Sequence, residues 1–140
     1  RPEIDLLAYK AGTNELLVIE VKSYLDSVGV DHRKVCVSYR EMEGRYKLFT
    51  NLKYRNLVFK RLTEQLKASG AIGGDTVPSL CLAVGKFKPE SEGPMRHHFD
   101  KKGWKLITPS EIREGLKGLA KVGYENDPTI LAAKMLLKNS

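Results

Sequence analysis

The fold is decided by residues 4–22, which read IDLLAYK, AGTN and ELLVIEVK in order. Two apolar runs flank a turn-like Gly-Thr-Asn, a pattern typical of a β-hairpin with a short loop. We therefore expect strands at about 4–10 and 15–23. The second run is apolar at nearly every position until Glu20 and Lys22 interrupt it.

The second strand carries two opposite charges on one face. Side chains alternate along a strand, so Glu20 and Lys22 point the same way. A carboxylate and an ammonium in so apolar a strand are costly to desolvate unless they are paired or bind a metal. The partner strand supplies Asp5. Two acids and a lysine on one sheet face predict a Mg²⁺ site with a neighbouring positive charge.

Length and composition fit one domain. The chain has 140 residues, of which 41% are hydrophobic and 29% charged, and these are globular values. We expect one domain over 1–140, with a core over about 3–108 and C-terminal helices over about 109–138. The longest apolar runs are 16–19 and 80–84, so we expect no membrane segment and no secretory signal at the start. We expect a cytoplasmic, nucleoid-associated protein.

Positive charge is concentrated in one block. The formal net charge is +7, and residues 33–67 hold ten basic and three acidic side chains, whereas the rest of the chain holds 14 of each. Aromatic side chains interleave with this block, which suits a phosphate backbone with stackable bases. The alternative is a solvated helix face with buried aromatics. On the first interpretation, DNA is the partner, and its contacts come from Arg40, Arg45, Lys47, Lys53, Arg55, Lys60 and Arg61.

The middle of the chain alternates a helix with two short strands. Residues 52–69 predict a helix, because apolar side chains recur on one helical face and Gly70 ends the pattern. Residues 79–85 predict a strand that is buried on both faces. Residues 88–100 are typical of an exposed loop, and 104–107 of a short last strand.

Two helices are expected at the C-terminal end. Residues 108–111 form a capping box with Pro at the first helical position, and the helix should run to about Lys121. A further helix is expected from Pro128 to about Lys138. We expect it to dock on the core through Leu131, Met135 and Leu136.

The segment between the hairpin and the first long helix has a weaker pattern. Residues 35–39 are rich in Val and Cys and predict a short extra strand, and 43–45 predict a turn. Together with the other elements, they predict an α/β fold with a mixed central β-sheet flanked by helices.

The hairpin pattern resembles the PD-(D/E)XK nuclease superfamily, also called the restriction-endonuclease-like fold. In that family an acid opens one strand of a hairpin, Glu-x-Lys stands on the next, and a helix and a strand follow. The resemblance covers roughly 3–86, with Asp5 and residues 20–22 as the motif, and Ile4 stands where the family often has Pro. The family also has a helix before the first acid. None precedes Arg1, so we expect the N-terminal helix to be missing from this sequence.

The resemblance implies a metal-dependent deoxyribonuclease, which we expect to be an endonuclease. Asp5 and Glu20 would bind Mg²⁺, with Mn²⁺ as a substitute, and the carbonyl of Val21 would add a ligand. The metal would polarise the scissile phosphate and activate a water. Lys22 would orient that water or stabilise the charge of the transition state.

Three further residues are secondary candidates. Glu3 lies two positions before Asp5, so the strand period places both on one face. Ser23 would assist Lys22, or it is an exposed serine at a strand end. Gln65 matches a glutamine that some branches of the superfamily contribute, or it is a polar residue at the edge of an apolar stripe.

Other polar side chains give weaker patterns. Adjacent His97 and His98 would point opposite ways on a strand, so we expect them to be structural or to face solvent. Cys36 and Cys81 lack zinc or nucleophile spacing and suit reduced thiols, with a single disulfide left open.

Two other classes of protein compete with the enzyme. One is a nucleic-acid-binding module of the same fold without catalysis. The other is a structural protein in which Glu20 and Lys22 form an internal salt bridge. A homodimer is also left open, because no interface can be recognised in the sequence.

Overall fold

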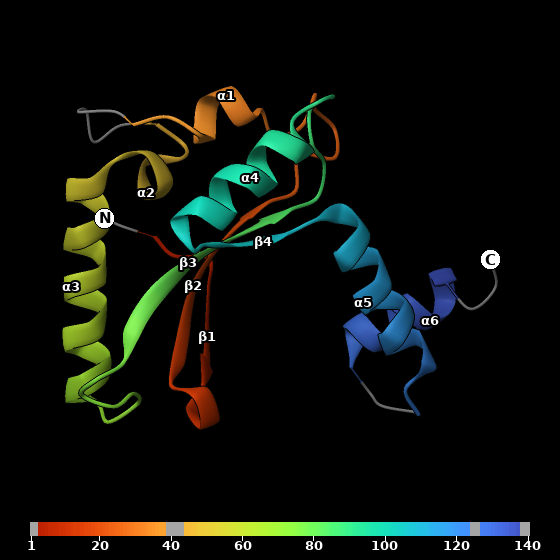
Figure 1. Cartoon of the computed structure of the whole chain (residues 1–140). Helices are drawn as coiled ribbons and strands as arrows, with labels where there is room; N and C mark the ends of the chain where they lie inside the picture. Colours follow the sequence, from red (N-terminus) through yellow and green to blue (C-terminus); the bar gives the residue numbers. More distant parts are fainter. Residues whose placement is uncertain (1–2, 39–43, 124–126, 138–140) are drawn as a thin grey trace.

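The computed structural model describes residues 3–38, 44–123 and 127–137. One four-stranded sheet with the order β1-β2-β3-β4 forms its centre (Figure 1). The strands are β1 (Leu6–Lys10), β2 (Glu15–Lys22), β3 (Val77–Val84) and β4 (Lys105–Ile107). The pair β1–β2 is antiparallel, and the pairs β2–β3 and β3–β4 are parallel. The predicted α/β class with a mixed sheet is therefore confirmed.

The N-terminal hairpin forms where it was predicted. A 3₁₀ turn, η1 (Ala11–Thr13), joins β1 to β2, and Asn14 closes it with a left-handed backbone at φ 54°. Asparagine tolerates this conformation better than most residues do. The register pairs Leu6 with Ile19, so the ladder of backbone hydrogen bonds ends shortly before Glu20.

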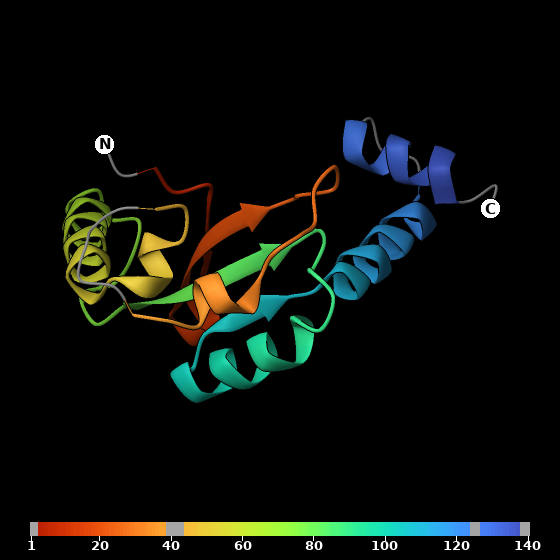
Figure 2. The same ribbon diagram turned by 90° about the horizontal axis from the view of Figure 1, so that it is seen from above.

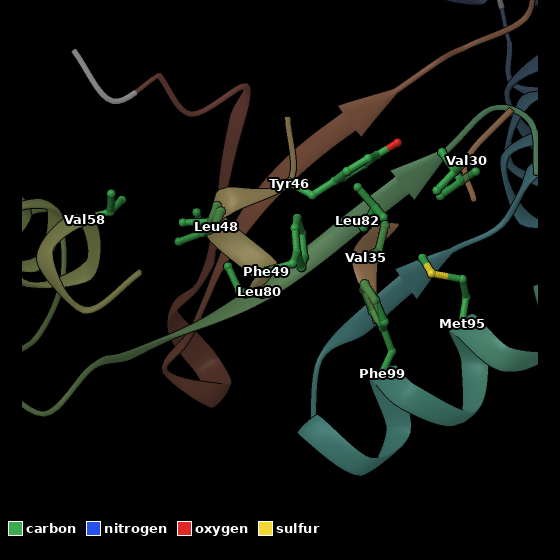
Figure 3. Close-up of a cluster of buried hydrophobic side chains, with 12 residues drawn as sticks. Val30, Val35, Tyr46, Leu48, Phe49, Val58, Leu80, Leu82, Met95 and Phe99 are labelled. Atoms are coloured by element: carbon green, nitrogen blue, oxygen red, sulfur yellow. The ribbon is translucent and has the colours of Figure 1, made fainter. Parts of the chain in front are cut away.

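Four helices enclose the core, most of them on one face of the sheet. They are α1 (His32–Val35), α2 (Lys47–Thr50), α3 (Leu52–Ala68) and α4 (Glu92–Lys102). Figure 2 shows α1 and α4 along this face. Helix α3 lies beyond one end of the sheet, and the C-terminal helices lie beyond the other end. The buried core joins β2 and β3 to these helices, and its side chains come from every one of them (Figure 3).

The long helix α3 matches the predicted 52–69. Asn51 caps it, because its side-chain oxygen accepts a 2.8 Å hydrogen bond from the backbone N–H of Tyr54. Val58 is the buried residue of its apolar stripe. The predicted strand at 79–85 is also confirmed as β3, and consecutive Leu80, Cys81 and Leu82 are all fully buried.

The prediction of an exposed loop over 88–100 is wrong. Helix α4 occupies Glu92–Lys102, and Met95 and Phe99, one helical turn apart, are fully buried in the core. The Gly93-Pro94 pair is typical of a loop, but Pro94 is the third residue of the helix. The backbone N–H at that position has no helical acceptor, so proline is tolerated there.

The extra strand predicted over 35–39 is wrong for the residues that the structure describes. The chain instead forms the single helical turn α1, which ends at Val35, and residues 36–38 belong to no strand. Asp31 caps this turn by accepting a 3.0 Å hydrogen bond from the backbone N–H of Arg33. The predicted turn at 43–45 agrees with Gly44 and Arg45, and its first residue lies outside the described ranges.

The C-terminal helices form a hairpin of their own. Helix α5 (Pro109–Lys121) begins with the predicted capping box, in which Thr108 and Glu111 exchange hydrogen bonds. Helix α6 (Pro128–Leu137) packs on α5 and lies beyond the edge of the sheet (Figure 1). Its predicted docking on the core is wrong, because Met135 and Leu136 are 75% and 74% exposed. The buried face of α6 carries Ile130 and Ala133 instead.

Candidate active site

Asp5 lies at the point where the β1–β2 ladder ends. Its Oδ2 accepts a 2.7 Å hydrogen bond from the backbone N–H of Val21. The last paired residues are Leu6 and Ile19, so the carboxylate of Asp5 takes the next amide of β2 that faces β1. The hairpin therefore fixes a carboxylate beside residues 20 and 21.

Glu20 and Lys22 form a partly buried ion pair on the neighbouring strand. The Nζ of Lys22 lies 3.1 Å from the Oε2 of Glu20, and the two side chains are 18% and 14% exposed, respectively. Both project from the face of β2 that carries buried Leu16 and Val18. The two acids and the lysine predicted to form a site thus lie together where β2 ends.

A cavity of about 230 Å³ opens beside Glu20. Its lining joins the residues before β1 to the turn before α2 and to the first turns of α3. The polar side chains in this lining are those of Glu3, Glu20, Arg45, Lys47 and Tyr54. Glu3 therefore lines the same cavity as Glu20, whereas Asp5 and Lys22 do not line it.

The donor atoms at this point are hard oxygens, which Mg²⁺ prefers. The N–H and C=O of one strand residue point toward the same neighbouring strand, so the carbonyl of Val21 faces Asp5 as its N–H does. The carboxylate of Asp5 bonds the amide of this same residue, and Glu20 precedes it in β2. Within the described ranges, no three His, Cys, Asp or Glu side chains form a ready metal-binding group. A metal here would rest on two carboxylates and a carbonyl.

Ser23 follows Lys22 at an exposed position, and its backbone is closely packed. A Cβ added at Gly85 would lie 2.5 Å from the carbonyl oxygen of Ser23. Gly85 also donates a 2.9 Å backbone hydrogen bond to the carbonyl of Lys22. The end of β2 is therefore held against the end of β3 by a contact that only glycine permits.

The structure does not bring Gln65 to the site. The cavity beside Glu20 is lined by Tyr54 and Val58, in the first turns of α3. Gln65 lies seven residues beyond Val58, which is about 10 Å farther along the helix. Its side chain is exposed, as a polar residue at the edge of an apolar stripe would be.

The predicted basic residues that the structure describes differ in their environments. Lys53, Lys60 and Arg61 are exposed on α3. Lys47 lies with its Nζ 4.7 Å from the ring centre of Tyr54, beside the cavity of Glu20. Arg40 lies outside the described residues.

Arg55 has a packing role that distinguishes it from the other basic residues. Its Nη1 donates to the carbonyl oxygens of Leu48 and Phe49, at 3.2 and 3.3 Å, and its guanidinium lies 4.9 Å from the ring centre of Trp104. Burial lowers the pKa of its guanidinium. Arg55 therefore ties α3 to α2 and to the start of β4, and we exclude it from the proposed DNA-binding surface.

Tyr24 is a residue at this site that the sequence pattern did not single out. Burial acts to raise the pKa of its phenol, but hydrogen bonds with Tyr46 and Arg45 outweigh it and lower that pKa. Its backbone has a left-handed φ of 45°, which costs about 1–3 kcal/mol in a residue other than glycine. The strand period could have found it, because Glu20, Lys22 and Tyr24 are spaced by two.

The histidines and cysteines form no site in the part of the chain that the structure describes. His97 and His98 lie on α4 rather than in a loop, and the His98 ring packs 5.8 Å from that of Trp104. Cys36 and Cys81 are free thiols, and burial raises the pKa of Cys81 to about 11.

No family model, curated protein or solved structure matches the chain. The resemblance to the PD-(D/E)XK superfamily therefore stays a prediction from residues. Among the described helices, none has the length and apolar character needed to cross a membrane.

Proposed function

We propose that the protein is a Mg²⁺-dependent nuclease that hydrolyses DNA phosphodiester bonds at the end of the β1–β2 hairpin. The observation that carries this proposal is the hydrogen bond of 2.7 Å from the amide of Val21 to the carboxylate of Asp5. Val21 stands between Glu20 and Lys22, whose side chains pair at 3.1 Å. An acid, a second acid and a lysine in this order are the residues that such chemistry uses.

The residues present fit a hard divalent cation. Asp5, Glu20 and the carbonyl of Val21 would hold it, and Mn²⁺ would substitute. The chemistry that a bound Mg²⁺ supplies is polarisation of the phosphate and a lower pKa of the attacking water. Asp5 is exposed, so its carboxylate is open to a ligand from solvent on the side away from Val21.

Lys22 supplies the positive charge of the site. Its Nζ is held by Glu20 in a region with little solvent. A fixed ammonium in such a region stabilises charge that develops in the transition state more strongly than it would in water. Lys22 would therefore orient the attacking water or stabilise the extra negative charge on the phosphorus oxygens.

The basic side chains that surround the hairpin support a polyanionic substrate. Arg45 and Lys47 line the cavity of Glu20, and α3 presents Lys53, Lys60 and Arg61 to solvent. Such residues bind phosphates without reading sequence, and their contribution falls as salt rises. We propose that this surface holds the backbone of the DNA while the hairpin acts on one phosphate.

A cleavage assay over duplex, branched and single-stranded DNA and over RNA, with Mg²⁺, Mn²⁺ or EDTA, tests the function. We expect cleavage of DNA in either metal and none in EDTA. Circular DNA tests the endonuclease mode, because only internal cleavage opens it. Absence of cleavage from the whole panel, by protein shown to be folded, would contradict the proposal.

The second candidate is a nucleic-acid-binding module without catalysis. It is favoured by the internal partners of the two acids, since Asp5 accepts from Val21 and Glu20 pairs with Lys22. Titration of Mn²⁺ followed by electron paramagnetic resonance separates the two candidates. The nuclease should bind Mn²⁺ and lose that binding in Glu20→Gln, whereas the module should bind DNA with no metal at the hairpin.

A further inference from the structure

A second cavity, here called the strand-end pocket, lies beyond the carboxyl ends of β2 and β3. Its volume is about 760 Å³. The segment after β2 forms one wall by returning beside the extension of β3. Val30 donates to the carbonyl of Lys86 and accepts from the amide of Lys88, both at 2.9 Å. Gly29 permits this approach, because a Cβ there would lie 2.5 Å from the backbone of Phe87.

The lining of the strand-end pocket is strongly basic. Among the described residues, it holds four cationic side chains and one acidic side chain, a formal balance of +3, from Arg33, Lys34, Arg45, Lys88 and Asp31. Asp31 is buried, and its carboxylate lies 2.8 Å from Arg33 and 3.0 Å from Lys88. The acid therefore fixes two of the cations in place. Among the described residues, Lys34 has no acidic partner.

Arg45 connects this pocket to the candidate active site. It lines the strand-end pocket and also the cavity beside Glu20. The phenol of Tyr24 contacts it, and Tyr24 follows Lys22 by two residues with a strained backbone. Strained residues persist where the surrounding structure holds them, and they gather at ligand sites. A ligand that spans the two cavities would pass over Arg45.

We propose that the strand-end pocket binds a backbone phosphate of the nucleic-acid strand, next to the phosphate that the hairpin would cleave. This inference rests on the proposed function in one respect, namely that the bound phosphate lies next to the one that is cleaved. The pocket has the size of a small-ligand site, and its balance of +3 suits an anion rather than a neutral group. Lys34 and Arg45 would contact the phosphate, while Arg33 and Lys88 stay anchored to Asp31.

Binding of a fluorescein-labelled oligothymidine in EDTA tests the pocket without any need for catalysis. The dissociation constant is measured by anisotropy between about 50 and 200 mM salt, where each phosphate contact to a single strand contributes about 0.7 to the slope of log K against log salt. Lys34→Gln is the decisive variant, because Lys34 lines the strand-end pocket and not the cavity of Glu20. Lys121→Gln, at an exposed position of α5, is the matched control.

We expect Lys34→Gln to weaken binding and to reduce the slope by about 0.7, with Lys121→Gln unchanged. The chemical shift of the Gly29 amide, measured by nuclear magnetic resonance, should change when thymidine 3′,5′-bisphosphate is titrated into the protein. Both results would support phosphate binding in the pocket even if the protein cleaves no DNA. Absence of cleavage would contradict only the proposed function.

An unchanged slope in Lys34→Gln would overturn the inference, and intact Mg²⁺-dependent cleavage would then leave the proposed function standing. A polyglutamate peptide of equal charge is the competitor. If it displaces the oligonucleotide equally well, the pocket recognises acidic chains in general and the phosphate assignment is overturned.

Discussion

The backbone N–H of Val21 donates its hydrogen bond to the carboxylate of Asp5 instead of to a backbone carbonyl of β1, with 2.7 Å between the nitrogen and Oδ2. This contact gives Asp5 a structural role beside its proposed role as a metal ligand. The two roles differ in their need for negative charge, because an amide oxygen can accept the same hydrogen bond but is a poor ligand for Mg²⁺.

Asp5→Asn should therefore separate the two roles. We expect it to reduce the free energy of unfolding by less than about 1 kcal/mol, and Asp5→Ala by about 1–2 kcal/mol. Cleavage should fall by about 100-fold or more in both, since even partners one step removed from a metal cost about 10–100-fold. Urea unfolding and initial cleavage rates measure these effects, with Asp100→Asn as an exposed control. Wild-type activity in Asp5→Asn would exclude the ligand role.

The Glu20–Lys22 pair should show strong coupling in a double-mutant cycle. Lys22→Met leaves a carboxylate that is only 14% exposed without its partner, so we expect a loss of about 1–3 kcal/mol in the free energy of unfolding. Adding Glu20→Gln should recover about 1 kcal/mol of that loss. Additive effects of the two substitutions would mean that the pair contributes nothing as a pair.

Arg55 and Lys60 should behave in opposite ways. Arg55→Met removes two hydrogen bonds to α2 and the contact with Trp104, so we expect a loss of about 1–3 kcal/mol in stability. Lys60→Gln, at an exposed position of the same helix, should leave stability within about 0.5 kcal/mol of wild type. Only Lys60→Gln should reduce the salt slope of duplex DNA binding, by about 0.9. A reduced slope in folded Arg55→Met would restore Arg55 to the DNA-binding surface.

Asp31 should make stability depend on acid pH. Hydrogen bonds from Arg33 and Lys88 hold the pKa of its carboxyl well below the usual value of about 3.9. The unfolded chain then binds more protons than the folded one, so this stabilisation is complete above about pH 5 and is lost as the pH falls below about 4. In Asp31→Asn, the free energy of unfolding should fall less at acid pH than it does in wild type. Urea unfolding at a series of pH values from about 3 to 7 measures this dependence. A loss of stability at acid pH identical to that of wild type would contradict the assignment of this loss to Asp31.

The sequence predicted the hairpin because its determinants are local. Alternation, an apolar run and a Gly-Thr-Asn turn all lie within residues 4–22, and period 2 placed Glu20 and Lys22 on one face. The capping box at Thr108 was equally local and forms as expected. The contact of Asp5 with Val21 was not predictable, because it depends on where the strand ladder stops.

The errors arose where distant packing decides the structure. Met95 and Phe99 are buried because α4 packs on α1 and β4 and because Phe99 stacks on Phe49 of α2. The Gly93-Pro94 pair concealed this helical stripe. The strand-end pocket depends on the pairing of Val30 with Phe87, which are 57 positions apart in sequence and carry no common motif. Tertiary contacts of this kind leave no periodic trace in the chain.

The central claim is tested most directly by the rate of DNA cleavage as Mg²⁺ is titrated into wild type, Lys22→Ala and Lys10→Ala. Lys10 is an exposed lysine at the far end of β1 and serves as the matched control. We predict Mg²⁺-dependent cleavage by wild type and Lys10→Ala, and a rate lower by about 100-fold or more in folded Lys22→Ala. Cleavage by purified Lys22→Ala at the wild-type rate would contradict the account.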